Sequence, residues 1–190
     1  MYKQLILAGF GGQGVISMGH LLVYAGMLEN KEVAYIPSYG AEMRGGTANC
    51  SVTVSSTPIR SPLVTEPDIL VVMNQPSLDK FEPVLKKGGT LFVNSSLVNR
   101  SAKRTDINVY YVPANELALL LEEPRAANMV MLGALLEADP VVNPLSVMES
   151  LKKVLAVNKH HLLPVNARAM EMGAGLIRQG DSLKITSQVG

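Results

Sequence analysis

Apolar positions along this chain alternate between short continuous runs and helical spacing. Residues 3–8 form an apolar run that ends at glycines, and Val15, Met18, Leu22 and Ala25 then recur with the spacing of one helical face. The stretch predicts a strand, a glycine-rich turn and a helix. Five further short runs predict strands, at 33–36, 47–56, 68–73, 90–96 and 108–114.

The order of these elements indicates the fold class. The run at 68–73 is continuous and apolar, as expected for a strand buried on both faces of a parallel sheet. A helix is predicted over 75–87, ending before Gly88 and Gly89. We expect the strand at 33–36 to stop at Pro37 and the strand at 47–56 to be a candidate for antiparallel pairing. Strands alternating with helices predict a Rossmann-like open, mostly parallel α/β sheet with flanking helices.

From residue 115 onward the pattern turns helical. Met129, Leu132 and Leu136 form one apolar stripe. Asn143 and Pro144 suit the N-cap and first turn of a further helix. Its expected apolar side chains are Leu145, Met148 and Leu155. A last helix is predicted from near residue 164 to 180. We expect residues 1–180 to form a single α/β domain with a helical C-terminal segment, and 181–190 to form a polar tail.

Composition narrows the class of protein. Of the 190 residues, 47% are hydrophobic and 17% are charged, against about 25% charged in soluble domains. This shortage suggests surface that is buried against other subunits. The apolar runs are shorter than the roughly 20 residues of a membrane span, and nothing at the start reads as a secretory signal, so we expect a cytoplasmic protein with no membrane contact. A formal net charge of +1 gives no electrostatic basis for binding nucleic acid.

The first candidate site is the glycine-rich stretch LAGFGGQGVISMG. Gly9, Gly11 and Gly14 have the G-x-G-x-x-G spacing that binds dinucleotides, between a predicted strand and a predicted helix. An acidic residue about 20 positions further on would grip a ribose hydroxyl, yet Ala34 to Ser38 contain none. Three interpretations stay open: nicotinamide binding, another phosphate or nucleotide contact, and a tight turn that serves packing.

A second glycine-rich loop, PSYGAEMRGGTA, follows the next predicted strand. In open α/β sheets, ligands lie at the carboxyl ends of the strands. The loop is either a simple turn or a contact surface for a ligand or partner subunit, in which Glu42 and Arg44 would carry the charges. Asn94, Ser95 and Ser96 end another strand and could line the same edge or cap that strand.

The sequence contains no self-sufficient catalytic constellation. Its one cysteine, Cys50, cannot supply the several thiolates of an iron–sulfur cluster or structural zinc, and we interpret it as a small buried hydrophobe. His20 falls off the apolar face of its helix, and His160 and His161 have no further ligand at metal spacing. A redox metal is therefore expected on a partner chain.

Five stretches together resemble a known family. They are GFGGQGVISMGHLL, PSYGAEMRGGTANCSVTVS, EPDILVVMNQPSLDKF, GGTLFVNSS and NMVMLGAL, and they occur in that order. The chain resembles, over about residues 1–178, the gamma subunit of the 2-oxoacid:ferredoxin oxidoreductases, which include pyruvate, 2-oxoisovalerate and 2-oxoglutarate synthases. The small subunit of the indolepyruvate enzyme is also similar.

The resemblance implies a function for the assembly. Such enzymes convert a 2-oxoacid and coenzyme A to acyl-coenzyme A and carbon dioxide, and they reduce ferredoxin. Thiamine diphosphate with Mg would be held by the alpha and beta chains, and the iron–sulfur clusters by the beta chain or a small ferredoxin-like delta chain. The gamma chain would pack on this core, help to enclose coenzyme A and be inactive alone, with homodimerisation an option for the isolated chain. General likeness favours 2-oxoglutarate weakly among the substrates.

The resemblance also implies the ligand or interface residues. It provides no catalytic or metal-binding residue on this chain. The glycine turn corresponds to Gly9, Gly11, Gly12, Gln13 and Gly14, and the second loop to Ser38, Tyr39, Gly40, Glu42, Arg44, Gly45 and Gly46. We expect Arg44 and the amides after Gly11 to face a phosphate of coenzyme A or a polar segment of the alpha or beta chain. The alternatives from other classes are an autonomous NAD(P)-dependent dehydrogenase and a solitary nucleotide-binding module.

Overall fold

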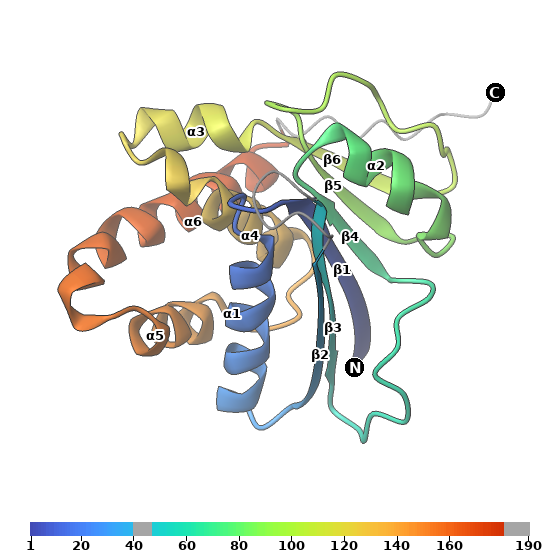
Figure 1. Cartoon of the computed structure of the whole chain (residues 1–190), viewed down its shortest axis with the longest axis horizontal. Helices are drawn as coiled ribbons and strands as arrows, with labels where there is room; N and C mark the ends of the chain where they lie inside the picture. Colours follow the sequence, from blue (N-terminus) through green and yellow to red (C-terminus); the bar gives the residue numbers. More distant parts are fainter. Residues whose placement is uncertain (40–46, 181–190) are drawn as a thin grey trace.

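The computed structural model of the chain describes residues 1–39 and 47–180 and contains a six-stranded sheet with helices on both faces (Figure 1). The strands lie in the order β2-β3-β1-β4-β5-β6. Their bounds are β1 Tyr2–Phe10, β2 Glu32–Tyr39, β3 Thr47–Ser55, β4 Ile69–Val72, β5 Thr90–Asn94 and β6 Asn108–Val112.

Strand direction confirms the predicted open, mostly parallel sheet. β4 pairs parallel with β1 and β5, and β5 pairs parallel with β6. β3 pairs antiparallel with both β1 and β2, so β2 points the same way as β1. β3 is therefore the one strand of the described sheet that runs against the others, and the carboxyl ends of the other five meet at one edge.

Helices cover the two faces unequally. The α-helices are α1 Val15–Leu28, α2 Gln75–Phe81, α3 Ala114–Leu120, α4 Ala127–Ala138, α5 Pro144–Val154 and α6 Leu163–Arg178, with 3₁₀ segments η1 Glu82–Val84, η2 Pro124–Ala126 and η3 Val157–Leu162. α2 packs on one face against buried side chains such as Leu70, Val72 and Leu91. The other described α-helices lie on the opposite side of the sheet (Figure 1).

The larger core lies between the sheet and α1 and α4. The predicted face of α1 is confirmed, because Val15, Met18, Leu22 and Ala25 are all buried. On α4 the predicted stripe is buried, but every residue from Met129 to Leu136 is buried as well. α4 lies between the sheet and α6, and a helix enclosed in this way is apolar all round.

The contact between α4 and α6 depends on two glycines. A Cβ atom on Gly133 would overlap the backbone carbonyl of Met170, and one on Gly173 would overlap the carbonyl of Val130. Backbone atoms cannot rotate out of the way as side chains do. The two helices can therefore approach this closely only where neither residue carries a side chain.

Two predicted boundaries and one predicted apolar position differ from the structure. The helix expected over 75–87 ends at Phe81 and continues only as η1, because Pro83 has no N–H and its ring disfavours a continuing helix. β2 does not stop at Pro37, which pairs opposite Cys50 in the outermost strand, where proline is tolerated. Leu145 is 78% exposed, whereas Val147 and Leu151 form the buried face of α5.

Candidate functional site

The described ends of the second glycine-rich stretch lie beside the glycine turn at the carboxyl edge of the sheet. Phe10, the last residue of β1, pairs with Thr47, and Ala48 pairs with both Gly9 and Tyr39. The end of β2, the start of β3 and the end of β1 are therefore neighbours. The expected site residues Gly40, Glu42, Arg44, Gly45 and Gly46 lie outside the described residues, and their roles stay predictions.

The glycine turn itself has clear steric causes. A Cβ atom on Gly9 would lie 2.8 Å from Oε1 of Gln13 and 3.0 Å from Cβ of Met73. Gly12 and Gly14 have φ angles of +96° and +79°, in the left-handed region that favours glycine. The turn closes through a 3.1 Å hydrogen bond from the backbone N–H of Gln13 to the carbonyl of Phe10.

The turn places the first residues of α1 at the carboxyl edge of the sheet. No described side chain caps this helix start. Gly14 is the N-cap residue, no side chain hydrogen-bonds the first N–H groups, and the first turn contains no acidic residue. Gly11 and Gly12 before it are exposed. N–H groups that no described side chain caps, together with the positive end of the helix dipole, favour an anion at this position.

Hydrogen bonds made by amide side chains hold the strand ends together at the carboxyl edge of the sheet. Oε1 of Gln13 accepts hydrogen bonds from the N–H of Phe10 at 2.6 Å and from Nδ2 of Asn74 at 2.9 Å, while its Nε2 donates to the carbonyl of Met73 at 3.2 Å. Nδ2 of Asn94 donates to Oδ1 of Asn115 at 2.8 Å. These bonds join the ends of β1, β4 and β5 to the start of α3.

These amide hydrogen bonds change the interpretation of two predicted site residues. The side-chain N–H groups of Gln13 and Asn94 donate to groups within the protein, and Asn94 is fully buried. We therefore interpret both residues as holding the strand ends in place rather than as contacting a ligand. Oδ1 of Asn94 has no hydrogen-bond partner within the described residues. Ser95 and Ser96 are half-buried after β5, and Oγ of Ser96 accepts from the N–H of Glu116 at 3.3 Å. Both interpretations of these serines, edge lining and capping, stay open.

Sequence reasoning missed three asparagines that complete the edge. Oδ1 of Asn74 caps α2 by accepting from the N–H of Ser77 at 2.9 Å. Asn115 and Asn128 reach Asn94 and the carbonyl of Gly14. For Asn74 a local signal existed, because asparagine before Gln-Pro suits an N-cap followed by a first-turn proline. The partners of the other two are distant in sequence and leave no local pattern.

The reactive side chains of the described residues do not form a catalytic group. Burial raises the pKa of the Cys50 thiol to about 12, so the thiol is protonated and inert, as expected of a buried hydrophobe. Nε2 of His160 and Nδ1 of His161 lie within hydrogen-bond distance of the backbone carbonyls of Leu155 and Asn158. Within residues 1–39 and 47–180, no three acidic, histidine or cysteine side chains gather as metal ligands.

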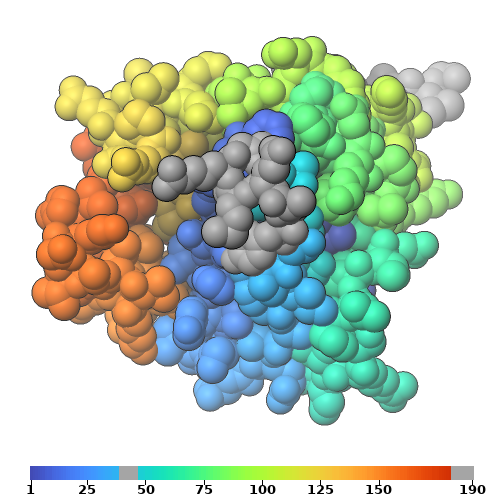
Figure 2. Space-filling model, in the orientation of Figure 1, coloured from blue at the N-terminus to red at the C-terminus, as the bar shows by residue number. Residues whose placement is uncertain are grey.

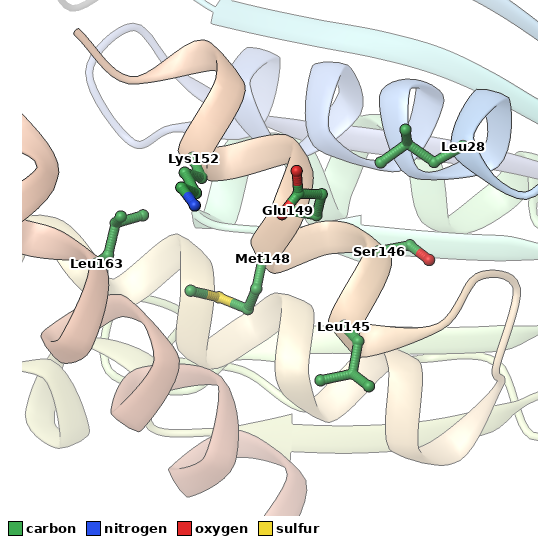
Figure 3. A pocket seen from close by; sticks show the side chains of 7 residues that line it. All are labelled: Leu28, Leu145, Ser146, Met148, Glu149, Lys152 and Leu163. Carbon is green, nitrogen blue, oxygen red and sulfur yellow. The ribbon is translucent and has the colours of Figure 1, made fainter. Parts of the chain in front are cut away.

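A shallow groove lies at the other end of α1 (Figure 3). Leu28, the last residue of α1, faces it, together with Leu145 and Met148 of α5 and Leu163 of α6. α1 rises about 21 Å over its 14 residues, which separates this groove from the glycine turn. No described helix, including those around the groove, has the length and apolar character that would let it cross a membrane.

Two known proteins show what the chain is similar to. The 2-oxoglutarate synthase subunit KorC of Methanothermobacter marburgensis is 36% identical, with 95% of this chain and 99% of KorC covered. The ketoisovalerate oxidoreductase subunit VorA of Methanothermobacter thermautotrophicus is 38% identical over 91% of this chain. The chain spans only 36% of the length of VorA.

One solved structure and one family model agree with these relatives. The gamma subunit of a keto/oxoacid ferredoxin oxidoreductase from Geobacter sulfurreducens superposes with a TM-score of 0.78 at 26% identity, covering 91% of this chain and 96% of that one. The model of the pyruvate ferredoxin/flavodoxin oxidoreductase family matches residues 4–176. This match extends over nearly the whole chain, so the chain belongs to the pyruvate ferredoxin/flavodoxin oxidoreductase family.

Proposed function

We propose that this chain is the gamma subunit of a 2-oxoacid:ferredoxin oxidoreductase. The observation that carries the proposal is the end-to-end similarity to KorC, which is covered over 99% of its own length. VorA carries the same region as about a third of a longer subunit. A region that occurs both as a separate chain and as part of a longer subunit is suited to packing on the rest of such an enzyme.

The proposed reaction belongs to the assembly. A 2-oxoacid and coenzyme A give acyl-coenzyme A and carbon dioxide, and two electrons pass to ferredoxin. We assign the iron–sulfur clusters to the beta or delta chain, because they need several thiolates and this sequence has one cysteine, which is buried and protonated. Following the family resemblance, we assign thiamine diphosphate and Mg to the alpha and beta chains. Identity alone does not separate 2-oxoglutarate from a branched 2-oxoacid, because KorC is 36% identical and VorA 38%. We favour 2-oxoglutarate because the match covers 99% of KorC but only 36% of VorA.

Within that assembly, the carboxyl edge of this chain would contact coenzyme A or the partner chains. The exposed Gly11 and Gly12 and the uncapped start of α1 offer N–H groups to a phosphate. Arg44 lies in sequence between the end of β2 at Tyr39 and the start of β3 at Thr47. Its guanidinium would donate two parallel hydrogen bonds to a phosphate or carboxylate. Gln13 and Asn74 would hold the turn in place for that contact.

The arrangement of strands argues against the autonomous dehydrogenase. In a dinucleotide-binding fold, the acidic residue that holds the ribose ends the parallel strand beside the glycine turn. Here the neighbour of β1 on that side is β3, which runs antiparallel and begins rather than ends at this edge. The end of β2, one strand further out, carries Ser38 and Tyr39 instead of a carboxylate.

The test is to purify the tagged chain from its native host without oxygen and to assay dye reduction that depends on both a 2-oxoacid and coenzyme A. Recovery with thiamine-binding and cluster-binding chains, with highest activity on 2-oxoglutarate, is the expected result. Recovery of the chain alone, with tight nicotinamide binding, would contradict the proposal. In the complex, Arg44→Ala should raise the KM for coenzyme A or weaken assembly, and no change in either would remove Arg44 from the site.

A further inference from the structure

One face of α5 borders the groove of Figure 3 and points away from the core. Val147 and Leu151 of this helix are buried, whereas Leu145 is 78% exposed and Glu149 and Lys152 are also exposed. At 3.6 residues per turn, the three exposed residues lie on one side of the helix and the two buried residues on the other. α5 therefore has a core face and an outward face, and the outward face lines the groove.

Apolar side chains from three helices surround the outward face. Leu28 at the end of α1 is 42% exposed, and Met148 of α5 and Leu163 of α6 are half-buried. With Leu145 they line the shallow groove, whose volume is about 640 Å³. A second cavity, of about 240 Å³ between α4, α5 and α6, is lined by Leu145, Met148 and Met170 among others. The apolar surface thus extends across α5, and contiguous exposed apolar surface marks sites where another protein binds.

The order of charges along α5 indicates which protein covers this surface. Glu149 and Lys152 are the charged residues of the groove lining, three positions apart. When two copies of a helix lie antiparallel about a two-fold axis, each contact between them occurs twice with the roles exchanged. Glu149 of each copy then lies opposite Lys152 of the other, and both ion pairs form together. Parallel helices in register would instead bring like charges together.

The partner of Glu149 within its own chain competes only weakly for this contact. Oε1 of Glu149 lies 3.9 Å from Nζ of Lys153, and both side chains are more than half exposed. Such an exposed pair contributes little to stability, because water screens the charges and both side chains lose freedom when they pair.

The antiparallel arrangement also covers the most exposed leucine of α5. Because a helix rises 1.5 Å per residue, Leu145 lies about 10 Å from Lys152 along α5. Pairing Glu149 with Lys152 of the other copy therefore places Leu145 of one copy beyond Lys152 of the other. Leu163 lies at that end of the groove (Figure 3). Each copy thus supplies both an exposed leucine and an apolar groove that receives one.

We propose that the outward face of α5 is the contact between two copies of this chain, packed antiparallel about a two-fold axis. Leu145 of each copy packs into the groove of the other, and two Glu149–Lys152 ion pairs fix the orientation. The inference goes beyond the proposed oxidoreductase function. Dimerisation is measured on the full chain without other subunits, so the failure of one proposal does not imply the failure of the other.

The first experiment is sedimentation velocity of the full chain over a range of concentrations. The chain should form a dimer with a Kd below about 1 mM. Leu145→Asp should raise this Kd by about tenfold or more, because it places a carboxylate without a partner in the apolar contact. Leu120→Asp is the matched control: Leu120 is 74% exposed on α3, which lies apart from α5 (Figure 1), so dimerisation should be unchanged.

A second experiment tests the orientation of the two copies by charge reversal. Glu149→Lys and Lys152→Glu should each weaken the homodimer by about tenfold, because each change turns both ion pairs into repulsions. An equimolar mixture of the two variants should restore the dimer, since every pair across the axis is again Glu opposite Lys. Affinity capture with a tag on one variant measures this mixed dimer.

Three outcomes would overturn the proposal. A chain that stays monomeric at about 1 mM would leave the groove to a different protein. A dimer that Leu145→Asp leaves intact would be held by another surface. A dimer that is lost on either charge reversal and not restored in the mixture would exclude the antiparallel arrangement. Retained circular dichroism spectra would establish that the variants are folded.

Discussion

Nδ2 of Asn74 donates a 2.9 Å hydrogen bond to Oε1 of Gln13, and this bond ties the glycine turn to the start of α2. The same oxygen accepts from the N–H of Phe10, and Nε2 of Gln13 donates to the carbonyl of Met73. One side chain thus satisfies polar groups on two adjacent parallel strands. The shape of the edge depends on Gln13 even though this residue does not need to touch a ligand.

Gln13→Ala should lower the free energy of unfolding by about 2 kcal/mol, because it removes the acceptor of the Phe10 N–H and of Asn74 Nδ2 and leaves the carbonyl of Met73 with Asn94 as its one side-chain donor among the described residues. Urea unfolding measures the change. Gln75→Ala is the control, since Gln75 bonds exposed groups of Asp79 and Asn99 and should cost about 0.5 kcal/mol or less. Equal losses in the two variants would show that Gln13 has no special structural role.

Gly14→Ala should destabilise the protein more than Gly88→Ala does. Both glycines have left-handed φ angles, +79° and +75°, and alanine pays about 1–2 kcal/mol at such angles. Only at Gly14 would the new Cβ also approach the side chain of Asn128, at 2.6 Å from its Nδ2. The difference between the two variants measures this clash, and Asn128→Ala combined with Gly14→Ala should recover part of it. A non-additive double-mutant cycle is the expected outcome.

Two glycine-to-alanine changes in the helical layer should have opposite signs. Gly133→Ala would press a methyl group onto the backbone of Met170 and should cost about 3 kcal/mol or more. Gly175→Ala, in α6, meets nothing nearer than 4.0 Å and should stabilise by about 0.5–1 kcal/mol through its higher helix propensity. Thermal unfolding of both variants tests the α4–α6 contact, and a stable Gly133→Ala variant would contradict it.

Cys50 should resist alkylation in the folded chain. Burial raises the pKa of its thiol to about 12 from an ordinary 9.0, so the reactive thiolate is scarce at pH 8. Because the folded state holds this proton more tightly than the unfolded state, the thiol's contribution to stability is complete below pH 9 and falls as the pH rises from 9 toward 12. Iodoacetamide labelling at pH 8 with and without urea is the measurement. Rapid labelling without urea would mean that the thiol is accessible.

Local pattern was enough to predict much of the fold. The first strand, glycine turn and helix of residues 2–28 follow from periodicity and glycine spacing alone, and the structure confirms them. The same holds for Asn143, whose Oδ1 caps α5 by accepting from the N–H of Leu145 at 2.9 Å. In each case the signal and the structure it predicts lie within one stretch of chain.

The remainder depends on contacts that sequence spacing does not encode. Gln13 and Asn74 are 61 positions apart, and the Asn128 contact with Gly14 spans 114. Pro37 was misjudged because its tolerance depends on β2 being the outermost strand, which only the strand order reveals. Leu145 was misassigned because its neighbours on α5, rather than Leu145 itself, face the core.

The antiparallel strand β3 lies between the glycine turn that follows β1 and the end of β2. Because β2 and β3 are neighbours that pair along their whole length, up to Tyr39 with Ala48, the segment between them is closed at its base by ladder hydrogen bonds. A parallel crossover would instead have routed a helix through this position. The sheet therefore fixes both described flanks of this segment at the edge where the glycine turn follows β1.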